Sequence, residues 1–115
     1  MPLMVWVEIG EHNGLPVRIF KNEKQAVRNS RSWDRTAFVL RSMAVSEIRR
    51  QIWERDSKRC THCGDVVTWH TMEMHERLWR GRGGEVSVYN GTTLCADCHA
   101  DAPVAGHGLR KVGVK

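Results

Sequence analysis

The chain has 115 residues, enough for a single domain or for a small domain with an added N-terminal element. Its formal charge of +5 and pI of about 9.4 favour an acidic partner, most commonly nucleic acid, without indicating a fold. The chain contains no apolar run long enough for a transmembrane helix and no basic-then-apolar signal sequence at its N-terminus. We therefore expect a cytoplasmic protein with no membrane partner.

The first 20 residues predict a β-hairpin. Residues 4–9 are apolar and rich in β-branched side chains, which is typical of a strand. The Asn13-Gly14 pair that follows is a strong hairpin signal. Residues 15–20 would form the returning strand, with Pro16 at its beginning or at a sheet edge. We interpret this hairpin as a structural unit; an additional arm that contacts DNA is the alternative.

The next two segments predict helices. Residues 21–31 are polar and basic, and Asn22 can cap a helix there. Residues 32–41 carry Trp33, Ala37, Phe38 and Leu40 at near-helical spacing, which predicts a short amphipathic helix.

A clearer helix is predicted over residues 46–56, with Ser46 as its cap. Arg49 and Arg50 lie mostly off its apolar side. They form either a solvated face or a surface that contacts phosphates, and we select both as DNA-binding candidates. One apolar stripe is made by Val45, Ile48, Ile52 and Trp53.

Two C-x-x-C pairs predict a structural zinc site. Cys60 and Cys63 are followed by Gly64, the pattern of a zinc knuckle, and Cys95 and Cys98 supply the second pair. A reducing cytosol favours four thiolates around one metal over two disulfides. The second pair, followed by His99, also matches covalent attachment of c-type haem. That alternative requires an exported protein and leaves the first pair unexplained.

The segment between the cysteine pairs predicts two strands joined by a long loop. Residues 66–76 are rich in β-forming side chains, residues 77–84 are basic and glycine-rich, and residues 86–94 lead back. This order would bring His75 near Leu94, and a helix beginning at about Ala96 would add His99. We therefore expect two imidazoles to lie side by side.

These residues resemble the HNH endonuclease family in its zinc-stapled form, which is common among bacterial and phage proteins. A typical member has C-x-x-C, a histidine-bearing strand, a Gly-Gly pair in a long loop, an Asn and a closing C-x-x-C-H. All occur here in order, from about Ile48 to Asp101. The resemblance implies an α+β chain with a ββα-metal (HNH) domain over residues 45–103. Residues 1–44 would be a β-hairpin and helical extension, and residues 104–115 a basic, mobile tail.

The resemblance assigns the site residue by residue. His75 falls on the position of a metal ligand, and Glu76 on that of the histidine that activates water. Asn90 matches the residue that fastens the loop through backbone hydrogen bonds. His99 matches the second ligand of the catalytic ion, which would be Mg²⁺, Mn²⁺ or another divalent ion, in addition to the structural Zn²⁺.

Glu76 departs from the family pattern. A glutamate has a pKa near 4.3 and is a poorer base at neutral pH than an imidazole near 6.5. Three interpretations stay open: a weakened natural enzyme, a natural binder without cleavage, or an engineered substitution. An alternative register makes His75 the base and Met74 a ligand, but a thioether is a poor ligand for Mg²⁺ or Mn²⁺. The H-E-x-x-H motif of zinc proteases fails because Trp79 stands at its second histidine.

The resulting hypothesis is a metal-dependent DNA endonuclease that leaves 5′-phosphate and 3′-hydroxyl ends, acting in a bacterium or a phage-infected host. Arg77, Arg80 and Arg82 would grip the DNA backbone. His62 and His70 are interpreted as surface or packed histidines. The alternatives are a non-catalytic zinc-containing DNA-binding module, accessory to a phage or host complex, and a purely structural zinc module. Sequence preference, single- or double-strand cleavage and oligomeric state stay open.

Overall fold

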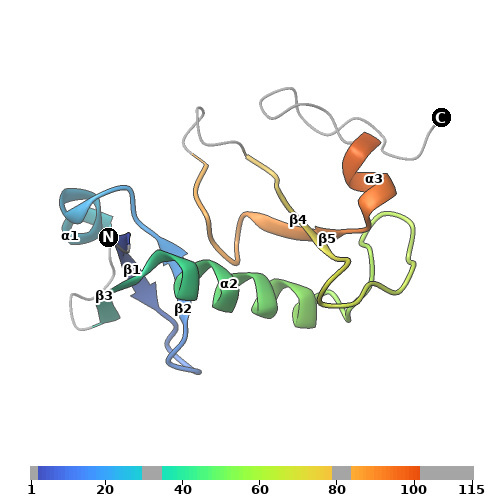
Figure 1. Cartoon of the computed structure of the whole chain (residues 1–115). Helices are drawn as coiled ribbons and strands as arrows, with labels where there is room; N and C mark the ends of the chain where they lie inside the picture. Colours follow the sequence, from blue (N-terminus) through green and yellow to red (C-terminus); the bar gives the residue numbers. More distant parts are fainter. Residues whose placement is uncertain (1–2, 30–34, 79–83, 102–115) are drawn as a thin grey trace.

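The computed structural model describes residues 3–29, 35–78 and 84–101, so Arg80, Arg82 and the predicted tail lie outside the described residues. The chain is a mixed α and β protein (Figure 1). No helix within the described ranges has the length and apolar character needed to cross a membrane. The elements in order are β1 (Met4–Ile9), β2 (Pro16–Ile19), α1 (Glu23–Asn29), β3 (Thr36–Leu40), α2 (Arg41–Arg55), β4 (Glu73–Glu76), β5 (Gly91–Leu94) and α3 (Ala96–Asp101).

The predicted N-terminal hairpin is confirmed. Strands β1 and β2 pair antiparallel, and Val7 lies opposite Ile19. Gly14 adopts a φ of 67°, which glycine reaches without steric penalty, and the Asn13 side chain accepts a hydrogen bond from the N–H of Leu15 at 2.9 Å. The Asn-Gly pair therefore forms the turn through the positive φ of the glycine and the side-chain hydrogen bond of the asparagine.

The helix predicted after Asn22 is confirmed as α1. The Asn22 Oδ1 accepts a hydrogen bond from the N–H of Gln25 at 2.9 Å, the bond expected of a helix cap. Ala26 is fully buried, and α1 contacts β1. This short helix thus covers part of the N-terminal sheet.

The helix predicted over residues 32–41 is wrong where the structure describes it. Residues 36–40 form β3, which pairs antiparallel with β1 and gives the sheet order β2-β1-β3. Ala37 and Val39 pack against the core, whereas Phe38 and Leu40 are 52% and 42% exposed. The side chains therefore alternate with the period of a strand. Ala37, Phe38 and Leu40 fit this period as well as a near-helical spacing.

Helix α2 begins at Arg41, directly after β3, and not at Ser46 as predicted. Leu40 occupies the cap position in an extended conformation without a side-chain hydrogen bond, and the N–H of Arg41 donates to the carbonyl of Leu3 at 2.8 Å. Tertiary pairing with the start of β1 therefore takes the place of a polar cap. The predicted domain limit after residue 44 falls inside this helix.

The main hydrophobic core lies along α2. Ile48 and Ile52 are fully buried, and they pack in one cluster with Val7 and Ile19 from the N-terminal sheet and with Val86. Figure 1 shows α2 running from the N-terminal sheet beneath the β4–β5 hairpin. The helix contacts both β2 and β5. Helix α2 therefore packs against both the N-terminal sheet and the β4–β5 hairpin.

Residues 86–88 extend the N-terminal sheet along β2. The N–H of Ile19 donates to the carbonyl of Val86 at 2.8 Å, and the N–H of Val88 donates to the carbonyl of Val17 at 2.9 Å. Ser87 forms the bridge opposite Arg18. The N-terminal sheet therefore holds the segment that leads into Asn90.

Strands β4 and β5 form a two-stranded antiparallel hairpin, with His75 opposite Thr92 and Glu73 opposite Leu94. Within the predicted β-rich run 66–76, only residues 73–76 form a strand. Helix α3 begins at Ala96, as predicted, and contacts both strands. An antiparallel hairpin followed by a short helix is thus formed by β4, β5 and α3, from residue 73 to residue 101.

Gly91 should be intolerant of a side chain. A Cβ added there would fall on Cδ1 of the fully buried Ile52, because the strand lies directly against α2. We expect Gly91→Ala to lower the free energy of unfolding by about 1–3 kcal/mol, measured by urea denaturation. Ile52→Val removes Cδ1, so Gly91→Ala should cost less in that background. An equal cost in both backgrounds would contradict the close approach.

Candidate functional site

The four cysteines converge on one point. Their Sγ atoms all lie within 4.8 Å of one another, and those of Cys63 and Cys95 are 3.8 Å apart. Zinc–sulfur bonds of about 2.3 Å in a tetrahedron separate the sulfurs by about 3.8 Å. The spacing therefore fits a structural metal such as zinc, as the two C-x-x-C pairs predict.

The local backbone explains why each pair presents its sulfurs to the same centre. Gly64 has a φ of 83°, and its N–H donates to the carbonyl of Cys60 at 2.9 Å, which closes the first knuckle. The N–H of Cys63 points at the Cys60 sulfur at 3.5 Å, and that of Cys98 at the Cys95 sulfur at 3.4 Å. Each pair thus has the same N–H···S geometry.

The thiols differ in how readily they ionise. Burial opposes ionisation of Cys60, but backbone N–H groups of Cys63, Cys95 and His62 lower its pKa to about 6. Burial and the neighbouring cysteines raise the pKa of Cys98. The protein alone therefore favours one thiolate and resists further negative charge beside it. A cation at the centre would remove that conflict.

The two predicted imidazoles lie side by side. The ring centroids of His75 and His99 are 5.7 Å apart, and the rings meet edge to face at 73°. His75 comes from β4, and His99 comes from α3, where its N–H donates to the carbonyl of Cys95 at 2.9 Å. The hairpin supplies one imidazole, and the helix that begins at the cysteine cluster supplies the other.

Glu73 lies beside the two imidazoles and contacts His99. The sequence analysis did not identify it. Its Oε1 lies 3.3 Å from Nδ1 of His99. Residues two apart on a strand share a face, so Glu73 and His75 both point toward α3. Met74, between them, packs against the core on the α2 side. The signal that could have found Glu73 is its spacing of two from His75, once residue 75 was assigned to a strand.

The surroundings of His75 favour its neutral form. Burial lowers the pKa of the imidazole, positive charge on His99 lowers it further, and the Glu76 carboxylate raises it by a smaller amount. A neutral imidazole has a free lone pair on one ring nitrogen, which is the form that binds metals.

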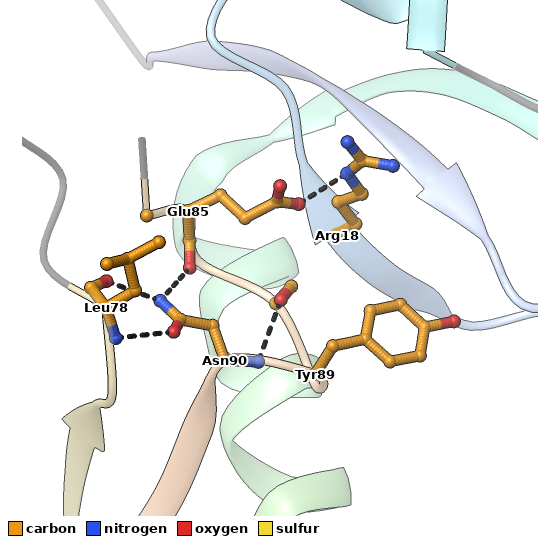
Figure 2. Close-up of a pocket in the computed structure, with 7 residues that line it drawn as sticks. Arg18, Leu78, Glu85, Tyr89 and Asn90 are labelled. Carbon is orange, nitrogen blue, oxygen red and sulfur yellow. Dashed lines mark hydrogen bonds and ion pairs between the residues drawn. The ribbon is translucent and has the colours of Figure 1, made fainter. Parts of the chain in front are cut away.

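Asn90 is hydrogen-bonded to both ends of the loop that joins β4 and β5. Its Oδ1 accepts from the N–H of Leu78 at 2.8 Å, while its Nδ2 donates to the carbonyls of Leu78 and Glu85 at 2.8 and 2.9 Å (Figure 2). Its own carbonyl accepts from the N–H of Arg77 at 2.8 Å. In Figure 2 the neighbouring Tyr89 ring points away from this network.

The predicted DNA-binding arginines differ in their surroundings. Arg49 donates to the carbonyls of Trp69 and Met72 at 2.9 and 2.8 Å and lies over the Trp69 ring, so it ties α2 to the segment before β4. Arg50 pairs with the acidic groups of α2 on either side of it. The Arg77 side chain is exposed and makes no hydrogen bond or ion pair with the described residues. Contact of these arginines with DNA stays a prediction.

His62 and His70 are both exposed, so each is a surface histidine. Comparison of the chain with protein-family models, with curated proteins and with solved structures gives no match. The HNH resemblance therefore depends on the sequence motifs alone.

Removing one thiol should release the metal. Structural zinc contributes on the order of 10 kcal/mol to the folding of small zinc domains, so we expect one zinc per chain and loss of folded structure in Cys60→Ser. Native mass spectrometry measures the zinc, and circular dichroism measures the fold. His62→Ala, in the same knuckle but exposed, is the control and should keep its zinc. A folded, zinc-free Cys60→Ser protein would show that the cluster is not a metal staple.

Replacing Asn90 should loosen the loop. Asn90→Ala removes three side-chain hydrogen bonds, and we expect the free energy of unfolding to fall by about 1–3 kcal/mol. The Leu78 amide should exchange with solvent faster in a hydrogen-exchange experiment. Asn90→Asp keeps the acceptor for that amide and loses the two donors, so its exchange rate should be intermediate. Unchanged exchange at Leu78 in Asn90→Ala would contradict this role.

Proposed function

We propose that this chain is a metal-dependent DNA endonuclease of the HNH type, in which β4, β5 and α3 form the ββα-metal unit. The observation that supports it is that His75 from β4 and His99 from α3, which are far apart in the sequence, lie with their ring centroids 5.7 Å apart. The family resemblance assigns a shared ion to these two positions, and it is made from sequence alone. The geometry therefore agrees with an expectation formed without it.

The donors at this place suit a divalent cation. His75 is held toward its neutral form, and the Glu73 carboxylate beside His99 adds negative charge to the same face. His75 and His99 would hold the ion, which when bound would stabilise negative charge on the scissile phosphate and on the departing 3′ oxygen. Mg²⁺, Mn²⁺ or another divalent ion fulfils that requirement. The cysteine cluster would hold zinc separately and would take no part in the reaction.

The other residues have separate tasks in this proposal. Residue 76 takes the proton of the attacking water, and a glutamate is a weaker base for this than the usual histidine. Asn90 holds the loop against β4 through its bonds to Leu78 and Glu85. Arg77, with an exposed and unpaired guanidinium among the described residues, contacts the DNA backbone together with Arg80 and Arg82. The products are 5′-phosphate and 3′-hydroxyl ends.

Glu76 also favours a second candidate, a non-catalytic zinc-containing module that binds DNA for a larger phage or host complex. A positioned general base contributes typically 10²–10⁴-fold to a rate, so its replacement can leave binding intact while cleavage is almost lost. The two candidates share the same fold and the same net charge of +5. They differ in whether a histidine in place of Glu76 restores hydrolysis of DNA.

Restoring the imidazole tests the proposal. We expect Glu76→His to nick supercoiled plasmid faster than the unaltered chain in Mg²⁺ or Mn²⁺, by on the order of 10²–10⁴-fold, because a base with a pKa near neutrality replaces a carboxylate. Agarose gels measure the rate. Glu76→Gln removes the same negative charge without adding a base, so it should not accelerate cleavage.

The histidine ligands provide the complementary control. His99→Ala in the Glu76→His background should abolish nicking, since one side of the ion site is then missing. Binding to a DNA duplex by both the unaltered chain and Glu76→His, without cleavage by either, would reject the enzyme and favour the DNA-binding module. Neither cleavage nor binding would leave only a structural zinc module.

A further inference from the structure

We propose that Glu73 is a positioning residue that fixes the tautomer and orientation of His99, so that His99 presents Nε2 to the cation. This inference rests on the proposed function, because it concerns the same ion site. It adds a residue to which the family resemblance assigned no role. The supporting contact is that between Glu73 Oε1 and His99 Nδ1 at 3.3 Å.

The arrangement leaves one ring nitrogen of His99 for a ligand. A neutral imidazole carries its proton on one nitrogen, and the hydrogen bond at that nitrogen decides which one. A carboxylate only accepts hydrogen bonds from a ring N–H, so Glu73 selects the form with the proton on Nδ1. The lone pair then lies on Nε2. Metal-binding histidines commonly donate their other N–H to a carboxylate in this way.

The position of Glu73 follows from the strand. It lies opposite Leu94 in the β4–β5 register, on the same face as His75, which lies opposite Thr92. Helix α3 lies over this face and contacts β4. The hairpin therefore directs a carboxylate and an imidazole together at His99, and the edge-to-face contact of the two rings keeps them adjacent.

Glu73 acts on His99 and is not itself a third ligand. Within the described residues, the four cysteines form the sole group of three or more His, Cys, Asp or Glu whose ligand atoms converge as a metal site requires. The side chains of Glu73 and His99 are 45% and 38% exposed, so their contact contributes little to stability. The contact instead fixes the orientation of the His99 ring. Without it, this imidazole, at the surface of a six-residue helix, can turn and exchange tautomers.

The tautomer of His99 tests the inference directly. Long-range ¹H–¹⁵N NMR on the full-length, zinc-loaded chain, at a pH where His99 is neutral, reports which ring nitrogen carries the proton. We expect the Nδ1–H form in the unaltered chain. Glu73→Gln offers both an acceptor oxygen and a donor NH2 and should weaken the preference for that form, whereas Glu73→Ala should give a mixture of both. Asp97→Asn, which removes an exposed charge from the same helix, should leave the tautomer unchanged.

Metal affinity provides the second measurement. We expect Mn²⁺, titrated into the zinc-loaded chain, to bind about 10–100-fold more weakly to Glu73→Ala, less weakly to Glu73→Gln and normally to Asp97→Asn. An Nε2–H tautomer in the unaltered chain would overturn the inference. So would unchanged tautomer and Mn²⁺ affinity in Glu73→Ala. Absence of Mn²⁺ binding to the unaltered chain would instead count against the proposed function, and the tautomer would still decide the role of Glu73.

Discussion

The position of half of the candidate site depends on the convergence of four thiols. Helix α3 has six residues, too few to be stable by its own hydrogen bonds. It is held because Cys95 precedes it and the buried Cys98 lies within it, and both join Cys60 and Cys63. His99 follows Cys98 directly. A change that disperses the thiols would therefore also displace the imidazole, although no cysteine takes part in the proposed reaction.

The other half of the site depends on the N-terminal sheet. Strand β2 pairs with Val86 and Val88, and those residues lead directly into Asn90, which fastens the loop at Leu78. A hairpin of two four-residue strands is marginal alone, and here α2 packs against β5 while the extension is bonded to the loop at Leu78 through Asn90. The N-terminal region therefore serves as a scaffold for the site, and one core along α2 includes Val7 and Ile19 from the N-terminal sheet and contacts Met74 of β4.

The sequence predicted features that depend on local chemistry. The cap at Asn22, the turn at Gly14 and the paired knuckles each follow from what a few neighbouring residues can do. It did not predict β3, because Phe38 and its neighbours fit both a period of two and a period near 3.6, and only pairing with β1 decides between them. Likewise, α2 begins without a polar cap because its first N–H finds a partner in a distant strand. Glu73 was missed for the same reason, since His99, its partner, is far away in sequence.

The register of the β4–β5 hairpin decides which side chains reach the site. Because side chains alternate along β4, Glu73 and His75 point toward α3 and Met74 points toward the core. A register slip of one residue would bury the imidazole and place the Met74 thioether on the α3 face. The register is fixed at both ends of β5: Asn90 precedes the strand and is bonded across the hairpin, and Cys95 follows it and joins the thiol cluster. This arrangement also removes support from the alternative with Met74 as ligand. The same register places residue 76 opposite Gly91, at the end of β4 and next to His75, so in the proposed reaction a base at this position would act beside the ion and not as one of its ligands.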